Sequence, residues 1–504
     1  MKRNSLTTAV VAGIAGVAGF AGLANAVDLN PDGVGQVLIY PYYTVNKSQD
    51  TQFSVVNTAD VGKAVKVRFL EGYNSREVLD FNLYLSPHDV WTAAISQPGS
   101  GDASSAAQLN TRDHSCIRPA LAFPYSFLPF AYDGTLASEP TDGGPTSLDR
   151  TREGYIEIIS MGDIRPLSDL DAATTHDNSS GVPGAGTPNC AAIGDDTAIA
   201  ADLDIPTGGL FGAGSVVNVG QGTYYNYNAD AIEGFVDNSI LYYPTGSLQP
   251  SLQEASNTVA APGARAFVFA NDGNLLTADY PRGIDAVSAI FMADSVYNEY
   301  NVDAGQGATS DWVFTFPTKR FYVDKLLYPA AVTAPFEEPF GGTVDGESRI
   351  NLGVTTYDRE ELNSVIVLPE CPSPVDPVHC FNQSPFLPYE VNVLSFLADG
   401  STAPTTSTVF GSNLFRTLNA VGLTGWADVD LNAPGFGHVL GGGVSPTGGA
   451  VNINGLPVTG FYASNVINAN ADPGVLANYS GVFRHRAHRS CTFATANPND
   501  LTCS

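Results

Sequence analysis

Short runs of β-branched and aromatic residues, separated by turn-forming residues, recur along most of this sequence. Between residues 51 and 94 they read TQFSVVN, AVKVRFL, VLDFNLYL and DVWTAA. Strands of this length and spacing are typical of antiparallel sandwiches. In AVKVRFL the apolar residues alternate with Lys66 and Arg68, which predicts a strand with one face in the core and one in solvent. We therefore expect a mainly-β fold of one or more antiparallel β-sandwiches.

Long segments rich in Gly, Ser, Pro, Asp and Thr separate many of these runs. Loops longer than the usual connection are often functional. We expect long loops of this composition between the strands, at 97–113, 133–150, 172–195, 240–262 and 399–408.

Helices should be few and short. The candidates are 285–300 and 358–362, whereas 312–316 and 320–323 are predicted to be strands. Asn454-Gly455 is the dipeptide preferred in two-residue hairpins, and it predicts a hairpin between the short runs on its two sides.

The densest apolar run is QVLIYPYYTV, residues 36–45. Proline cannot donate to a strand ladder, so Pro41 predicts a sheet edge or a bulge at this point. A strand of this kind near the start of a mature chain can also be donated to a neighbouring copy. A self-assembling surface subunit is therefore one alternative for the function.

Residues 1–26 have the pattern of a secretory signal peptide. Lys2 and Arg3 precede a weakly hydrophobic stretch, and Ala24-Asn25-Ala26 is an A-x-A cleavage site. We expect export and cleavage, with the mature protein at the cell surface, outside the cell or in the periplasm. No later stretch is apolar for long enough to predict a transmembrane helix in the mature chain.

The remaining chain is long enough for roughly two to four domains. We predict two β-rich regions, at 27–330 and 331–504. The formal net charge of −28, from 23 Lys and Arg against 51 Asp and Glu, disfavours nucleic acid as a partner.

Six cysteines in an exported chain predict disulfides, because the compartments outside the cytoplasm are oxidising. Order along the chain leaves 15 connectivities open. Local closure favours Cys371–Cys380 and Cys491–Cys503, which leaves Cys116–Cys190. No C-x-x-C pair occurs to suggest a metal site built from these thiols.

Asp28-Leu29-Asn30-Pro31-Asp32-Gly33 reproduces the first half of a calcium loop, D-x-N-x-D-G. Asp28, Asn30 and Asp32 would be the oxygen ligands, and calcium is the one cofactor that the sequence suggests. The closing acidic position is Ile39, so the bidentate ligand is missing. The alternative interpretation is an Asx turn that precedes the first long strand.

Arg484-His485-Arg486-Ala487-His488-Arg489 is the one strongly basic stretch in an acidic chain. In a single strand, Arg484, Arg486 and His488 would share one face. They would then contact an anionic glycan or an acidic patch of another subunit. The alternative is a set of internal ion pairs.

Motifs of hydrolytic enzymes are absent from the sequence, which contains no G-x-S-x-G, H-E-x-x-H or P-loop pattern. A glycosidase needs two carboxylates across a cleft, and 51 acidic residues do not nominate a pair. The stretch Tyr224-Tyr225-Asn226-Tyr227 could stack on sugars, or it could pack across strands.

Four segments resemble a group of large, poorly characterised exported proteins of Gram-negative bacteria, labelled cell-surface or hypothetical proteins. They are NTADVGKAVKVRFLEGYNSREVLDFNLYLSPHDVWTA (57–93), REGYIEIISMG (152–162), SDWVFTFPTKRFYVD (310–324) and NYSGVFRHR (478–486). The resemblance implies export and a β-rich architecture, and it carries no catalytic residues.

We therefore expect an exported cell-surface or extracellular protein with a structural or adhesive role and no catalysis. Its expected partners are surface glycans or further copies of itself. Besides the self-assembling subunit, the alternatives are a calcium-assisted carbohydrate-binding protein and a secreted polysaccharide hydrolase.

Overall fold

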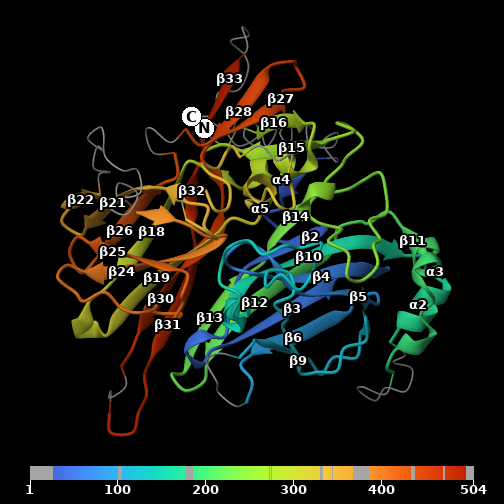
Figure 1. Cartoon of the computed structure of the whole chain (residues 1–504), viewed down its shortest axis with the longest axis horizontal. Coiled ribbons are helices and arrows are strands. Elements are labelled where there is room, and N and C mark those ends of the chain that lie inside the picture. The colour runs from blue at the N-terminus through green and yellow to red at the C-terminus, as the bar shows by residue number, and fades with distance from the viewer. Residues whose placement is uncertain are drawn as a thin grey trace, which may run out of the picture.

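The computed structural model describes residues 26–99, 105–176, 186–271, 273, 275–329, 333–342, 344–366, 385–432, 437–468 and 472–494. Within these residues the fold is mainly β, as predicted, with largely antiparallel sheets and four short helices. Figure 1 shows a blue and green half, from the first part of the chain, beside a yellow to red half from the second.

Two sheets form the first half. The eight-stranded sheet has the order β1-β14-β2-β10-β4-β5-β8, and β11 pairs with β10. Its strands are β1 (Asp28–Leu29), β2 (Val37–Thr44), β4 (Gly62–Glu71), β5 (Glu77–Leu85), β8 (Cys116–Arg118), β10 (Glu153–Ile164), β11 (Leu203–Asp204) and β14 (Asp230–Glu233).

The six-stranded sheet packs against it in the order β13-β12-β3-β6-β7-β9. Its strands are β3 (Asp50–Asn57), β6 (Val90–Ser96), β7 (Gln108–Asn110), β9 (Tyr125–Ser126), β12 (Leu210–Asn218) and β13 (Thr223–Asn228). Aromatic rings fill the space between the two sheets. Phe53 of β3 packs edge-on against Phe69 of β4 and against Trp91 of β6, at centroid distances of 5.7 and 5.6 Å.

Three five-stranded sheets and two short strand pairs form the second half. One sheet contains β15 (Ala264–Phe269), β16 (Leu275–Tyr280), β27 (Val439–Val444), β28 (Ala450–Asn454) and β33 (Cys491–Ala494). Another contains β18 (Ser295–Asn301), β21 (Gly353–Asp358), β22 (Asn363–Ile366), β26 (Thr424–Asp430) and β32 (Arg486–His488). The third contains β19 (Ala308–Thr315), β24 (Val391–Ala398), β25 (Phe415–Ala420), β30 (Thr459–Val466) and β31 (Tyr479–Arg484). The strand pairs are β17 (Met292–Ala293) with β29 (Leu456–Pro457), and β20 (Ile350–Asn351) with β23 (Phe386–Leu387).

The last described strands connect these sheets. β31, β32 and β33 follow one another within residues 479–494, and each belongs to a different five-stranded sheet. Strands β18 and β19 precede residue 330 but pair with β26, β24 and β30, which follow it. The division of the chain into domains stays a prediction.

The helices are short. They are α2 (Asp169–Thr174), α3 (Asp196–Ala201), α4 (Gly283–Phe291) and α5 (Arg320–Val323), with 3₁₀ turns η2 (Asn46–Ser48), η3 (Leu148–Arg152), η4 (Cys190–Ala192), η5 (Leu252–Glu254) and η6 (Ala304–Gln306). The helix expected at 285–300 ends at Phe291, because the next residues alternate between buried and exposed and form β18. The strand expected at 320–323 is α5 instead.

Two further local predictions were wrong. Residues 358–362 form a turn rather than a helix, in which the Asp358 carboxylate accepts the backbone N–H groups of Glu360 and Leu362 at 2.9 Å. Asn454-Gly455 does not close a hairpin. The chain leaves one sheet there and joins another, since β28 pairs with β27 and β33 whereas β29 pairs with β17.

The interpretation of Pro41 as a bulge is confirmed. Strand β2 lies inside the eight-stranded sheet, between β10 and β14. The register with β10 shifts from Tyr43–Gly154 to Tyr40–Ile156, so Pro41 and Tyr42 lie opposite one residue. Pairing with β14 covers only Val37 to Ile39. This strand is therefore paired within its own chain on both sides.

The outer face of the eight-stranded sheet is covered, which the alternation in β4 did not predict. Lys66 and Arg68 are 0% and 2% exposed. Arg68 contacts Glu77 at 2.5 Å, and Glu157 lies 3.6 Å from Arg68 and 3.1 Å from Arg320 of α5. Arg68 also donates to the Leu248 carbonyl at 2.9 Å. The loop around residue 248 and α5 therefore close over this face, and its charges are paired because they are out of solvent.

A second buried ion cluster lies where β4 ends. Arg150 of η3 binds Glu71 at 2.7 and 3.0 Å, and it also binds Asp142. The side chains of all three residues are 0% exposed. Arg150 also lies over the Tyr132 ring, 4.4 Å from its centroid. The cluster joins η3, β4 and the loop at residue 142 by paired charges and an aromatic contact.

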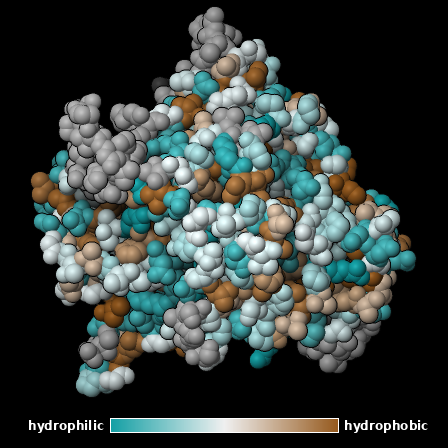
Figure 2. All heavy atoms as spheres, viewed as in Figure 1, coloured by the Kyte–Doolittle hydropathy of each residue, from teal (hydrophilic) through white to brown (hydrophobic). Residues whose placement is uncertain are grey.

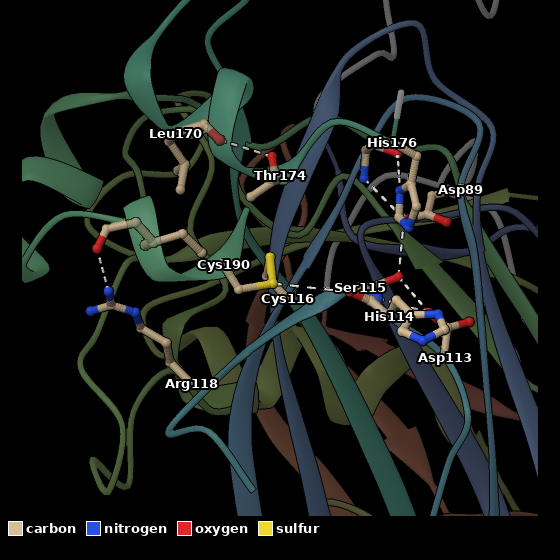
Figure 3. The surroundings of a disulfide bond; sticks show 12 residues. Asp89, Asp113, His114, Ser115, Cys116, Arg118, Leu170, Thr174, His176 and Cys190 are labelled. Atoms are coloured by element: carbon tan, nitrogen blue, oxygen red, sulfur yellow. Dashed lines mark hydrogen bonds and ion pairs between the residues drawn. A yellow bond between two sulfur atoms is a disulfide. The ribbon is translucent and has the colours of Figure 1, made fainter. Parts of the chain in front are cut away.

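The predicted disulfide between Cys116 and Cys190 is present (Figure 3). It ties β8, at one edge of the eight-stranded sheet, to η4. The neighbouring helices α2 and α3 place Leu170 and Ile199 in one apolar cluster with Met161 of β10. The disulfide therefore fixes another part of the cover over this sheet. Cys491 is also disulfide-bonded, whereas Cys371, Cys380 and Cys503 lie outside the described residues, so the other two pairings stay predictions.

Candidate functional site

The outer face of the six-stranded sheet forms an open groove with a volume of about 520 Å3. Along β3, Phe53 and Val55 point into the core, so Gln52 and Ser54 point outward. The same alternation in β13 buries Tyr225 and Tyr227 and leaves Tyr224 52% exposed. The groove therefore lies on the face of this sheet opposite the sandwich core.

Strand register places small and neutral polar side chains in rows across the groove. One row runs through five strands, and the other through four. The first contains Asn226, Ser215, Gln52, Ala94 and Asn110, and the second contains Asn228, Ala213, Ser54 and Thr92. Alanine and serine near the middle leave the floor low, while Tyr224 stands on one side and Arg112 on the other.

Several side chains of the groove have unused hydrogen-bonding capacity. Within the described residues, the side chains of Gln52, Ser54 and Asn110 make no hydrogen bond, and Arg112 makes no ion pair. Tyr224 is held in place, because its hydroxyl accepts from Ser215 at 2.8 Å and its backbone is bonded to Ser480 of β31. The groove thus combines one oriented aromatic ring with several free donors and acceptors.

The charge of the groove differs from that of the whole protein. The chain has 51 acidic residues, but none of the described side chains that line the groove is acidic. Glycoside hydrolysis uses a pair of carboxylates at the bond that is cleaved. These groups therefore suit the binding of a neutral polar ligand and not general acid–base chemistry on it.

The predicted calcium ligands form a turn. The side-chain oxygen of Asn30 accepts the Asp32 backbone N–H at 2.9 Å, and its amide donates to the Val34 carbonyl at 2.7 Å. Asp28 lies in β1 opposite Glu233, and burial raises the pKa of its carboxyl. The described part of the chain contains no group of three or more His, Cys, Asp or Glu side chains placed to hold a metal ion.

The predicted anion contacts do not share one strand face. Arg484 ends β31, whereas Arg486 and His488 belong to β32 in another sheet. His485 between them stacks on Phe314 at 4.9 Å, and burial lowers the pKa of its imidazole to about 3. Arg484 is paired with Asp230 at 2.5 Å and His488 with Asp294 at 2.7 Å. Arg486 is exposed.

Sequence reasoning identified only one part of the groove, the Tyr-rich stretch at 224–227. The outward residues of β3, β6 and β12 that line the groove are neutral and mostly small, and such residues also occur on ordinary solvated strands. The signal that could have found them is their coincidence in register across strands that are distant in sequence. This register is visible only once the strand order is known.

Neither a protein-family model, nor a curated protein, nor a solved structure matches this chain. Among the described segments, every helix is too short or too polar to span a bilayer. On the face shown in Figure 2, hydrophobic residues are scattered among hydrophilic ones. The site is therefore interpreted from its own geometry and chemistry.

Proposed function

We propose that this protein is exported, is displayed at the cell surface or outside the cell, and has an adhesive role in which the groove binds neutral glycan chains. The observation that carries the proposal is the lining of the groove. Among the described residues it has one exposed, oriented tyrosine and unpartnered neutral amide and hydroxyl groups, and no carboxylate, in a strongly acidic protein. Sugar hydroxyls hydrogen-bond to such groups, and a sugar ring packs on an aromatic face.

The Cys116–Cys190 disulfide and the signal-like residues 1–26 support export. The absence of acidic side chains from the groove favours binding over hydrolysis there. Strand β2 is paired on both sides inside its own sheet, so donation of this strand gives no support to self-assembly. No arrangement of the described residues favours calcium assistance.

A glycan array screened with the purified mature protein tests the proposal. Neutral oligosaccharides should give the hits, and Tyr224→Ala should weaken binding of the best one by about tenfold, which is the loss of one good contact. Tyr479→Ala is the matched control, because Tyr479 is 65% exposed and lies outside the groove lining. An array without hits, or equal losses in the two variants, would overturn the proposal.

A further inference from the structure

A second pocket adjoins Asn228, at the end of one of the two rows that cross the groove, and contains two arginines. It has a volume of about 290 Å3 and is bounded by the turn after β1, by β14, by β15 and by the segment that follows β31. Its lining includes Asn30, Pro31, Asp230, Phe269, Arg484 and Arg489. The calcium-like turn and the basic stretch, which are more than 450 residues apart in sequence, therefore form walls of the same pocket.

Arg484 is the partnered arginine of the pocket. Its guanidinium contacts the Asp230 carboxylate at 2.5 Å, and its side chain is 67% exposed. Asp230 is 5% exposed and also accepts from Thr459. A neighbouring, smaller hollow of about 240 Å3 shares Asn228, Asp230 and Arg484 with this pocket. The Arg484–Asp230 pair therefore belongs to the walls of two neighbouring hollows.

Arg489 is the unpartnered arginine. Its backbone is fixed on both sides by Asn271, which accepts from the Arg489 N–H at 3.0 Å and donates to its carbonyl at 2.8 Å. Its guanidinium has no hydrogen bond or ion pair to any described residue, and Nε is buried. The carboxylates nearby are occupied, Asp230 by Arg484 and Asp294 by His488 at 2.7 Å.

Such an arrangement costs solvation free energy. A guanidinium stays protonated at physiological pH and has five N–H donors, so one that is partly buried, with its Nε out of solvent and unpaired, loses part of its solvation without compensation. Burial and the nearby Arg484 both lower the pKa of Arg489. An oxyanion placed between the two arginines would offset the repulsion between their positive charges. It would also accept hydrogen bonds from the free N–H groups of Arg489.

We propose that this pocket binds an oxyanion, either the carboxylate of an acidic sugar or a phosphate group, with Arg489 as its main contact and Arg484 as its second. The apolar rim, which includes Phe269 at 48% exposure, would pack on the body of the ligand. The volume limits that body to about one sugar ring, since pockets for larger ligands exceed roughly 300 Å3. This site is separate from the groove and does not depend on the glycan proposed there.

Thermal unfolding and calorimetric titration with three probes test the proposal. Inorganic phosphate and glucuronate are the two oxyanion probes, and glucose is the neutral control. Stabilisation by phosphate alone, by glucuronate alone or by both would support the site and identify the source of its anion. Added salt should weaken the response. No response to either anion at millimolar concentration would overturn the proposal.

Arg489→Gln separates a ligand-binding arginine from a structural one. The variant should lose the anion response by about tenfold or more. Without ligand it should melt at a slightly higher temperature than the wild type, because a partly buried charge without a compensating partner is gone. If Arg489 instead supported the fold, Arg489→Gln would melt at a lower temperature than the wild type. An anion response retained in this variant would contradict the assignment.

Two further variants complete the test. Arg486→Gln is the matched control, because Arg486 is exposed, lies three residues from Arg489 and lines neither hollow, and it should respond like the wild type. Arg489→Lys keeps the charge but loses the planar fork, so its affinity should fall between those of the wild type and Arg489→Gln. This second variant keeps the test decisive if Arg489→Gln does not fold.

Discussion

The first sandwich has two outer faces, and both are polar. On the eight-stranded sheet that face is covered by the rest of the chain, and its charged side chains are buried in ion pairs such as Arg68 with Glu77. On the six-stranded sheet the face is open, and its side chains are mostly neutral and without partners. A polar strand face therefore occurs in two forms in this molecule. Paired charges fix one part of the protein to another on the covered face, whereas the open face has unpaired neutral groups, which the proposed function assigns to ligand binding.

The largest effect is expected on the covered side of this comparison. Arg150→Met removes the partner of Glu71 and Asp142, two side chains that are 0% exposed. Leaving buried carboxylates unpaired should lower the free energy of unfolding by about 3 to 5 kcal/mol. Urea denaturation followed by tryptophan fluorescence measures the change. Arg112→Met on the open face is the control, and a similar loss there would break the distinction between the two faces.

The Cys116–Cys190 disulfide should also stabilise the segment that covers the eight-stranded sheet. Replacing both Cys116 and Cys190 by serine opens a loop that spans 74 residues, which should cost about 2 to 4 kcal/mol of stability. The midpoint of denaturation should fall, and protease should cut first in the α2–α3 segment. If the midpoint is unchanged, packing alone holds this part of the cover.

A titratable group in the eight-stranded sheet should give a smaller, pH-dependent effect. Burial and the facing Asp28 raise the pKa of the Glu233 carboxyl from 4.5 to about 7. Between these two values the folded protein holds a proton that the unfolded chain releases, so the contribution of Glu233 to stability is greatest below pH 4.5 and is lost as the pH rises to about 7 and above. At pH 8, Glu233→Gln should be more stable than the wild type by about 1 to 2 kcal/mol, allowing for partial solvent exposure.

Melting temperatures of the wild type and Glu233→Gln, measured from pH 4 to pH 8, check this result. The two proteins should coincide at the acid end and separate as the pH rises. Curves that stay parallel over the whole range would show that Glu233 has an ordinary pKa.

The smallest effect is expected on the open face. Gln52→Ala removes a side chain that is exposed and makes no hydrogen bond to the described residues, so stability should change by less than about 0.5 kcal/mol. Glycan binding in the groove should nevertheless weaken. Parallel denaturation and binding measurements separate the two outcomes, and a large loss of stability would show that Gln52 supports the fold.

The class of fold was predictable because it depends on local patterns, whereas the Cys116–Cys190 disulfide spans 74 residues and was predicted only as the pair left over by two local closures. Alternating apolar residues and turn residues indicate short strands at any place in a chain. Pro41 indicated its bulge because proline lacks the N–H group that strand pairing requires in any sheet. The use of a strand's second face was not predictable. Lys66 and Gln52 each occupy the outward position of an alternating strand, yet the first is buried and the second is exposed.

The sites depended on pairings between distant segments. Arg489 lines a pocket only because Asn30 and Asp230, which are distant in sequence, form other walls of it. The groove likewise forms only when four or five strands pair in register. Tertiary contacts also overrode local propensity in α5. There, one helical turn directs Arg320 to Glu157 and Tyr322 to Ser288, two contacts that an extended strand would not make together.

The placement of β31, β32 and β33 in three different sheets has a consequence for the order of folding. Each five-stranded sheet of the second half lacks one strand until residues 479–494 have left the ribosome. Contacts of such long sequence separation form slowly, and open strand edges in unfinished sheets favour aggregation. The three sheets of this half therefore cannot be completed until residues 479–494 have been synthesised, so their completion is expected to be a late step of folding.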